Sequence, residues 1–309
     1  MEQQQPRYVV IGDINVDLSM AIAGWPHEGG DALAHGVTWS NGGTGLNCAV
    51  AAARMGYAVA LAARVGTDPA AAQGIACAHA AGVDTRGVQH DPHIPTGLCV
   101  IPVTPSGERT FLSYRGANVQ WHYDPPLHGA QGWLHVCGHA LLSDPQRANS
   151  LAALADAQRR GWQTSIDLCD PLAADSTAVA AALAAPLTVL LGNEREHAAL
   201  AASAPIPAHT VVTKRGAGGA RVDGPVSAAV AGYVVDAVDT TACGDAFGAV
   251  FCGALAHGAA VNEALQVANA TGAVTASRRG AADIVPTRAD VIRFLQLYDT
   301  RLPAWLAPH

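Results

Sequence analysis

The sequence predicts an α/β fold, with a central, mostly parallel sheet flanked by helices and a second, smaller β-sheet attached to it. Short apolar runs alternate with alanine-rich helical stretches along most of the 309 residues, which is typical of parallel strands covered by helices on both faces. Residues 18–40 and 96–114 break this rhythm, because their polar and apolar residues alternate as in hairpins. The two hairpins can pair into a small sheet, for which a natural use is a lid.

The individual elements follow from the same periodicity. Strands are predicted at residues 8–14, 59–65, 133–137, 164–168, 188–191 and 210–213. Helices are predicted at residues 46–55, 69–80, 145–160, 177–184, 194–201, 245–257, 262–278 and 288–298. Because no internal repeat or low-complexity linker divides the chain, we expect a single domain over residues 1–309, with the lid formed by 18–40 and 96–114.

Composition excludes several classes of protein. Half of the residues are hydrophobic, only 14% are charged, and the formal net charge is −7. So few basic residues leave no surface for a polyanion, and we expect no nucleic-acid partner. No apolar run reaches the roughly 18 residues of a membrane span, so no membrane segment is expected. Lys214 is the only lysine of the chain, and it stands inside a glycine-rich stretch.

The cysteines and the start of the sequence indicate a reducing compartment. The seven cysteines are scattered and no two form a C-x-x-C pair, so neither a zinc site nor a disulfide framework is predicted. Residues 1–7 are polar and lead directly into an apolar run, without the pattern of a signal peptide. We therefore expect a cytoplasmic protein.

The most informative motif is D-T-T-A-C-G-D-A-F at residues 239–247, followed by an apolar helix. Ala242, Cys243 and Gly244 form a turn of small residues at a helix N-terminus, where free N–H groups and the helix dipole can hold a phosphoryl group. Asp245 in the first turn can take a proton from an alcohol that attacks phosphorus. An acid is also simply favourable at a helix start, and the whole nine-residue string is what favours catalysis.

Two further motifs offer polar groups to a ligand. In S-N-G-G-T-G-L-N, residues 40–47, the paired Gly42 and Gly43 let the backbone lie against a polar ligand, and Asn47 offers a donor and an acceptor. In G-D-I-N-V-D, residues 12–17, the side chains Asp13, Asn15 and Asp17 follow the first strand, at the sheet edge where α/β proteins bind ligands. Asp17 can accept hydrogen bonds from two vicinal hydroxyls.

These motifs, in this order, resemble the ribokinase-like (PfkB) carbohydrate kinases over residues 8–294. The family has a large α/β domain with a small β lid, and it transfers the γ-phosphoryl group of ATP to a hydroxyl. The resemblance implies that Asp245 is the catalytic base and that residues 242–244 form the anion hole. It assigns sugar binding to Asp17, Gly42, Gly43 and Asn47. Arg115 and Asn118, in Y-R-G-A-N, are candidates for contacts to the sugar at the base of the lid.

The resemblance also places the nucleotide. Asn193 and Glu196 match the family's N-x-x-E element, in which Glu196 would hold a water of Mg²⁺. Gly216 and Gly219 resemble the nucleotide loop, which puts Lys214 near the ATP phosphates or ribose. Asn269 falls on the adenine side, Asp239, Thr241 and Gly280 fall where the family can bind a monovalent cation such as K⁺, and the lid implies a homodimer.

Departures from the family pattern narrow the substrate. The usual turn is G-A-G-D, and both replacements, Ala242 and Cys243, are small enough to keep backbone donation. Thr44 stands where kinases of ribose and of phosphosugars tend to carry lysine. The substrate is therefore expected to be an unphosphorylated sugar or sugar derivative that accepts the phosphoryl group on a primary hydroxyl.

Three alternatives stay open at this point. A nucleoside kinase of the same family is compatible with Thr44, although aromatic residues to stack on a base are few. A sugar-binding regulator could have kept the fold and lost the chemistry, against which the intact Asp245 and Glu196 argue. A dinucleotide oxidoreductase ranks last, because no G-x-G-x-x-G follows the first strand.

Overall fold

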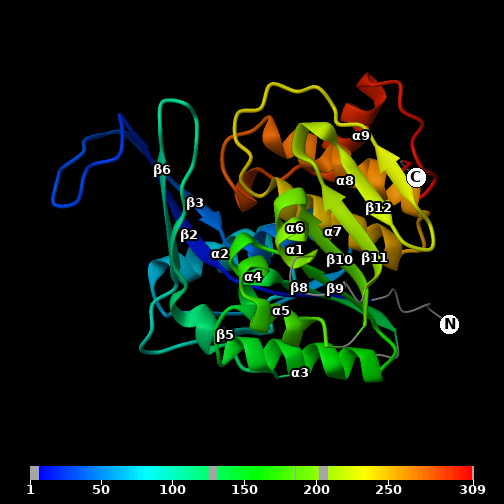
Figure 1. The fold of residues 1–309 in the computed structure, drawn as a ribbon, viewed down its shortest axis with the longest axis horizontal. Coiled ribbons are helices and arrows are strands. Elements are labelled where there is room, and N and C mark those ends of the chain that lie inside the picture. Colours follow the sequence, from blue (N-terminus) through cyan, green and yellow to red (C-terminus); the bar gives the residue numbers. More distant parts are fainter. Residues whose placement is uncertain (1–6, 125–130, 185, 202–207, 308–309) are drawn as a thin grey trace.

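The structure is a computed structural model that describes residues 7–124, 131–184, 186–201 and 208–307. It contains a large sheet with helices on both faces and a smaller sheet that stands to one side (Figure 1). Within these residues no helix is long and apolar enough to cross a membrane. The predicted α/β class, with its mostly parallel sheet and a separate small sheet, is confirmed.

The large sheet places seven parallel strands beside two antiparallel ones at one edge. Its strands, in spatial order, are β13 (Ala228–Val230), β12 (Ala220–Asp223), β11 (Ala208–Lys214), β10 (Leu187–Asn193), β9 (Gln163–Asp167), β8 (Gly132–Cys137), β1 (Arg7–Ile11), β4 (Val59–Val65) and β5 (Val88–His90). The strands from β11 to β5 run parallel, whereas β12 and β13 pair antiparallel. Parallel strands bring their carboxyl ends to one edge, where the polar motifs gather.

Helices bury apolar residues against both faces of the large sheet. One face carries α1 (Thr44–Arg54), α2 (Pro69–Ala80), α7 (Cys243–Ala256), α8 (Val261–Ala276) and α9 (Arg288–Leu297). The other carries α3 (Gln146–Arg159), α4 (Asp170–Ala174), α5 (Ser176–Ala182) and α6 (Glu194–Ala201). Helix α2 coincides with the predicted range 69–80, because Asp68 accepts a hydrogen bond from the Ala71 N–H and Pro69 fits the first helical position.

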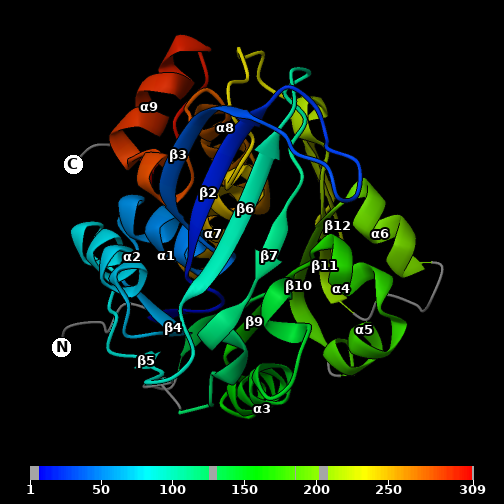
Figure 2. The same cartoon turned by 90° about the vertical axis from the view of Figure 1, so that its left-hand side faces the viewer.

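The two hairpins pair as expected into the smaller sheet. Its strand order is β3 (Ala34–Gly42), β2 (Asn15–Ile22), β6 (Gly97–Val103) and β7 (Leu112–Tyr114), with β2 and β6 parallel and the outer pairs antiparallel. Figure 2 shows this sheet as a layer of its own, crossing in front of the helices and of the large sheet. Strand β2 begins within the polar motif at residues 12–17, and strand β3 ends within the polar motif at residues 40–47. The smaller sheet therefore borders the candidate site.

Several elements differ from the prediction. The first strand ends at Ile11 and not at residue 14, because Gly12 packs against Gly45 so closely that a Cβ on Gly12 would lie 2.6 Å from the Gly45 Cα. Strands β5, β12 and β13 and helix α4 were not predicted. They have three to five residues each, too few to show a period.

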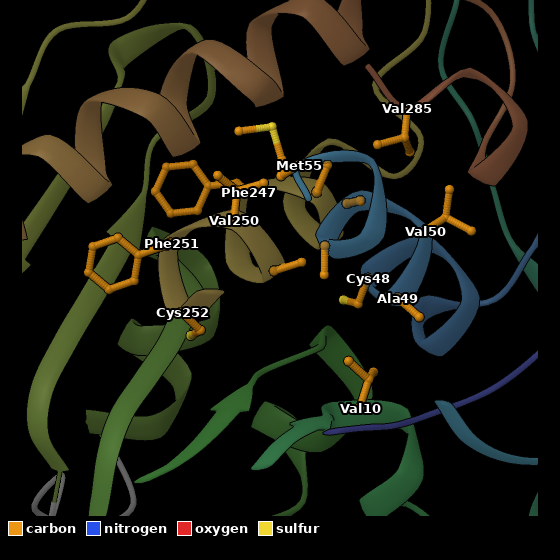
Figure 3. Packing of buried hydrophobic residues seen from close by; sticks show 14 of the residues in the cluster. Val10, Cys48, Ala49, Val50, Met55, Phe247, Val250, Phe251, Cys252 and Val285 are labelled. Atoms are coloured by element: carbon orange, nitrogen blue, oxygen red, sulfur yellow. The ribbon is translucent and has the colours of Figure 1, made fainter. Parts of the chain in front are cut away.

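The helix that carries the candidate base rests on a tightly packed core. Phe247, Val250 and Phe251 of α7 are buried between α8, α1 and the sheet, and Cys48 of α1 and Cys252 of α7 point toward the strands (Figure 3). Glycine and alanine elsewhere on α1 and α7 let the two helices approach each other. This packing fixes the N-terminus of α7 relative to the start of α1.

Candidate active site

The anion turn, residues 239–244, bends sharply into the N-terminus of α7. Ala242 caps the helix with a left-handed backbone (φ 61°, ψ 0°), a conformation that favours glycine. The N–H groups of Gly244 and Asp245 lie in the first turn, where an α-helix supplies no acceptor from its own backbone. The turn therefore presents backbone N–H donors and the positive end of the α7 dipole.

Asp245 is held by the start of α1. Its Oδ2 accepts a hydrogen bond from Asn47 Nδ2 at 2.8 Å. Burial raises the pKa of Asp245 to about 6, against the lowering effects of the Asn47 bond and of the Lys214 charge. A carboxylate with such a pKa is ionised near neutral pH and is a stronger base than an exposed aspartate.

Lys214 lies beside the anion turn. A Cβ on Gly244 would stand 3.2 Å from Lys214 Nζ. This amino group also donates to both carboxylate oxygens of Asp167, at 2.6 and 2.8 Å. Burial opposes the charged form, but the Asp167 carboxylate outweighs it, so the pKa of Lys214 is raised and the amine stays charged. Asp167, at the end of β9, was not predicted as a site residue, because its partner stands 47 positions away.

Asn193 and Glu196 cap α6 reciprocally. Glu196 Oε2 accepts from the Asn193 N–H at 2.7 Å, and Asn193 Oδ1 accepts from the Glu196 N–H at 2.9 Å. Glu196 is buried, and burial raises its pKa. The Lys214 charge opposes that rise, which places the carboxylate within electrostatic range of the lysine.

The glycine loop follows Lys214 at the end of β11, and Asn269 lies beside the chain that follows β13. Gly216 is exposed with φ 53°, in the 3₁₀ turn Gly216–Gly218. Gly219 packs against β13, since a Cβ there would lie 2.1 Å from the Val230 carbonyl oxygen. Asn269 of α8 donates from Nδ2 to the Ala231 carbonyl at 2.8 Å, which ties the helix to the chain after β13.

Asp17 projects from β2 with Gly42 directly behind it. A Cβ on Gly42 would lie 2.1 Å from Asp17 Oδ2, so Gly42 serves to make room for this carboxylate. Burial, and then the nearby carboxylates of Asp239 and Asp283, raise the pKa of Asp17 to about 7. Gly43, with φ 92°, opens α1 where a side chain would strike the Asp13 backbone.

Asp13 and Arg115 form a buried ion pair at the same end of the sheet. Arg115 Nε and Nη2 each donate to Asp13 at 2.9 Å, and Gln146 Nε2 donates to Asp13 Oδ1 at 3.1 Å. Asp13 is thus a paired, buried carboxylate and not a solvated loop acid. The pair keeps Arg115 in place with its Nη1 still available, because that atom has no partner among the described residues.

Asn118 and Asn15 support the loop between β1 and β2. Asn118 is fully buried, accepts from the Ile14 N–H at 3.0 Å, and donates to Asn15 Oδ1 at 2.9 Å and to the Arg115 carbonyl at 2.9 Å. Both the oxygen and the nitrogen of its side-chain amide are therefore hydrogen-bonded within the protein. We therefore assign it a supporting role in place of the predicted sugar contact.

Four buried polar atoms near the start of α1 and the Asp13–Arg115 pair lack a hydrogen-bond partner among the described residues. They are Thr44 Oγ1, Asn47 Oδ1, Arg115 Nη1 and His139 Nδ1. A buried polar group without a partner costs free energy, so these atoms mark a place for a polar ligand. His139 was missed by the sequence analysis, because a lone histidine after β8 belongs to no motif; burial lowers its pKa, so it is a neutral donor or acceptor.

Asp239, Thr241 and Gly280 lie together in the structure. Asp239 Oδ1 accepts from the Thr241 N–H at 2.9 Å, and Oδ2 accepts from the Gly280 N–H at 3.2 Å. The same carboxylate forms an ion pair with Arg109, whose Nη2 lies 3.2 Å from Oδ1. Arg109 was not predicted, since it lies 130 residues upstream, in the connection between β6 and β7.

Two of the seven cysteines lie close together beside a buried histidine. The side chains of Cys48, His135 and Cys137 lie with their ligand atoms within 4.8 Å of one another, between α1 and β8. His135 is oriented by a 2.9 Å contact with Ser165 Oγ, and Cys48 Sγ donates to the Asp245 carbonyl at 3.4 Å. The cluster therefore contacts the first turn of α7 through the hydrogen bond from Cys48 to the Asp245 carbonyl.

Comparisons with known proteins agree with this geometry. A model of the pfkB family of carbohydrate kinases matches residues 5–288, and the chain therefore belongs to that family. It is 30% identical to a fructokinase of Vibrio alginolyticus over 279 residues, which cover 82% of this chain and 91% of the relative. It is 32% identical to an ATP-dependent ribose-1-phosphate kinase of Halopiger xanaduensis over 297 residues, which cover 94% and 98%.

Solved structures show the same fold. The fructokinase of Vibrio cholerae O395, solved with fructose, ADP and a calcium ion, superposes with a TM-score of 0.76 at 27% identity, covering 94% of this chain and 99% of its own. A nucleoside kinase of Methanocaldococcus jannaschii, from the ribokinase family, reaches 0.83 at 16% identity over 94% and 98%. The expected resemblance is confirmed, and the relatives named here are two fructokinases, a kinase of the sugar phosphate ribose 1-phosphate and a nucleoside kinase.

Proposed function

We propose that this protein transfers the γ-phosphoryl group of ATP to a primary hydroxyl of an unphosphorylated sugar or sugar derivative. One observation carries the proposal: the Asp245 carboxylate is fixed by Asn47 at the N-terminus of α7, beside the charged Lys214. The hydroxyl oxygen attacks phosphorus, its proton passes to Asp245, and the bond between phosphorus and the ADP oxygen breaks.

The anion turn and Lys214 stabilise the charge of the transferring group. The first-turn N–H groups of α7 would face the phosphoryl oxygens, and the Lys214 ammonium would add positive charge beside them. Asp167 positions Lys214 through two short hydrogen bonds. Lys214 therefore acts on the phosphoryl group itself in this mechanism, closer to the chemistry than the ribose contact that its sequence position also allowed.

ATP and Mg²⁺ would lie between the Asn193–Glu196 cap and Asn269. The donor set fits magnesium, since Glu196 is a buried carboxylate with one oxygen on the Asn193 N–H and a second oxygen to hold a metal-bound water. An Mg²⁺ ion held there would neutralise the negative charge of the phosphates. Gly216 and Gly219 shape the nucleotide loop, and Asn269 borders the adenine side through its bond to the Ala231 carbonyl.

The sugar would lie between Asp17 and the four unpartnered polar atoms. The Asp17 carboxylate can accept hydrogen bonds from two hydroxyls, and Asn47 Oδ1 and Thr44 Oγ1 can complete the contacts. Arg115, held by Asp13, leaves Nη1 for a ligand oxygen. Thr44 offers no positive charge, which favours a substrate without a phosphate group.

We propose that the smaller sheet is a lid and that residues 1–309 form one ribokinase-like domain. The face that carries Asp17 turns toward the site. On the opposite face, the cross-strand pairs Leu18–Trp39 and Val100–Leu112 set apolar residues side by side. Trp39 is 62% exposed and Leu112 is 52% exposed. Burial of this face by a second copy of the chain would make a homodimer through the lid.

A cytoplasmic location fits the thiols. The seven cysteines are scattered along the sequence without a C-x-x-C pair, and free thiols of this kind are typical of proteins in a reducing compartment.

A coupled ADP-release screen tests the proposal. Purified protein with ATP and Mg²⁺ would be offered pentoses, ketohexoses, sugar acids, nucleosides and ribose 1-phosphate, with ³¹P NMR to identify the phosphorylated position. We expect turnover on an unphosphorylated sugar or sugar derivative. Turnover restricted to ribose 1-phosphate or to nucleosides would refute the assigned substrate class, and nucleotide binding without turnover on any acceptor would refute the kinase activity.

A further inference from the structure

Arg109 reaches from the lid to the anion turn. It follows a tight turn between β6 and β7, in which the Gly107 N–H donates to the Thr104 carbonyl at 2.9 Å. Its side chain is 18% exposed, and Nη2 lies 3.2 Å from Asp239 Oδ1 and 3.3 Å from the Val238 carbonyl oxygen. One guanidinium therefore bridges a side chain and a main-chain oxygen at the start of the turn.

Asp239 is the residue that organises the turn, and its charge needs a counter-charge. Its carboxylate fixes the backbone of Thr241 and of Gly280, and its side chain is only 10% exposed. A buried carboxylate is costly unless a cation pairs with it. Here it also lies close to the place proposed for the phosphates, so an unpaired negative charge would repel the substrate.

The residues around Asp239 do not fit a bound monovalent cation. Such an ion needs oxygen ligands free of other positive charge. The Asp239 carboxylate already accepts two N–H groups and the Arg109 guanidinium, and the Val238 carbonyl accepts from the same guanidinium. A potassium ion beside Asp239 would meet the charge of Arg109 at close range.

We propose that Arg109 supplies, from within the chain, the positive charge that the family resemblance assigned to a monovalent cation. The inference rests on the proposed kinase function. Because Arg109 belongs to the lid, the charge reaches Asp239 only when the lid lies over the site. Arg109 is thus a positioning residue that couples lid closure to the neutralised, ordered anion turn, and the enzyme works without K⁺.

The pKa shifts of two residues near Asp239, one in the sugar site and one in the anion turn, agree with this role. The Asp239 charge raises the pKa of Asp17 in the sugar site and of Cys243 in the anion turn, in each case after the larger effect of burial. Arg109 acts in the opposite direction on Cys243. The guanidinium thus reaches the turn that holds the phosphoryl group.

The test compares Arg109→Ala with the wild type in KCl and in choline chloride at equal ionic strength. Arg86→Ala is the control, since Arg86 pairs with Asp84 far from the site and is 82% exposed. We expect wild type and control to have equal kcat/KM in both salts. Arg109→Ala should lose about 10- to 100-fold in choline, the usual range of a coupling between sites, and K⁺ should restore part of it along a saturation curve.

Thermal melting gives a readout that does not depend on activity. A cation present at ten times its Kd would raise the melting temperature of Arg109→Ala by about 2 °C in KCl over choline, whereas the wild type should not respond.

Strong K⁺ activation of the wild type would overturn the proposal. So would an Arg109→Ala variant with wild-type kinetics in choline, or one whose losses and melting ignore K⁺. If Arg109→Ala fails to fold, Arg109→Lys must keep K⁺-independent activity, and its dependence on K⁺ would equally overturn the inference. A wild type that binds ADP but phosphorylates nothing would refute the kinase function instead, and the melting comparison would still decide the role of Arg109.

Discussion

Replacement of Lys214 by methionine separates the electrostatic role of this residue from its structural role. The change removes the ammonium next to Gly244 and leaves Asp167 buried without its partner. Loss of one partner of a buried ion pair costs about 3–5 kcal/mol of unfolding free energy. For a chain of this length that lowers the melting temperature by about 5–8 °C. Loss of one preorganised charge at the transferring group lowers kcat by about 10²- to 10³-fold.

The double variant Lys214→Met with Asp167→Leu distinguishes the two roles. It removes both charges, keeps the volume apolar, and should recover most of the stability, because burying an ion pair gains little over well-packed apolar residues. Activity should stay low, since the positive charge is still missing. Arg221→Met is the control, because the Arg221–Asp223 pair is 57% and 48% exposed and should contribute under about 1 kcal/mol.

Steady-state kinetics and thermal melting on all four proteins give the answer. Folded single and double variants with equally low kcat would support a direct action of Lys214 on the phosphoryl group. A double variant that regains both stability and near-wild-type kcat would refute it, and the Lys214–Asp167 pair would then be a structural contact.

Three further predictions test other parts of the account. Because Asp245, with a pKa of about 6, and the sugar-binding Asp17, with a pKa of about 7, both act when ionised, log(kcat/KM) should fall with slope one below about pH 7 and with slope two below about pH 6, and a flat profile from pH 5 to 8 would contradict these assignments. Ala242→Gly should raise the melting temperature by about 1–2 °C with activity retained, since an L-residue in the left-handed region costs about 1–2 kcal/mol and glycine recovers part of it; a lower melting temperature would argue against that backbone. Trp39→Glu should convert a dimer into a monomer in light scattering, whereas Val234→Glu, at a residue that is 88% exposed outside the lid, should not; equal masses for the two variants would place the interface elsewhere.

Most of the fold was predictable because periodicity is local. The longer helices and strands, which contain several periods of their hydrophobic pattern, were predicted to within a few residues of their ends. Strands β12 and β13 were missed because four and three residues beside glycine turns show no pattern, and their place is set by pairing with β11. The sequence indicated that the two hairpins could pair into one sheet. It did not indicate which residues of β2 pair with which residues of β6, because that register depends on contacts between distant segments.

The site was predictable where a motif is contiguous. Ala242, Gly244 and Asp245 lie where the nine-residue string placed them, because the string itself encodes the turn and the helix start. The partners of the charged residues were not predictable, because ion pairs between distant segments leave no spacing to recognise. Asp167 with Lys214 and Arg109 with Asp239 are of this kind. Each of them changes the expected electrostatics of the anion turn.

Asp245→Asn tests the central claim most directly. The change keeps size and helix position but removes the carboxylate that accepts the proton, and Asp223→Asn on β12 is a control at a half-buried position outside the site. With the best substrate of the screen, kcat of Asp245→Asn should fall by about 10²- to 10⁴-fold while ATP and sugar affinities, measured by calorimetry, change little. A folded variant that binds both substrates and keeps near-wild-type kcat would contradict the proposal that Asp245 is the base.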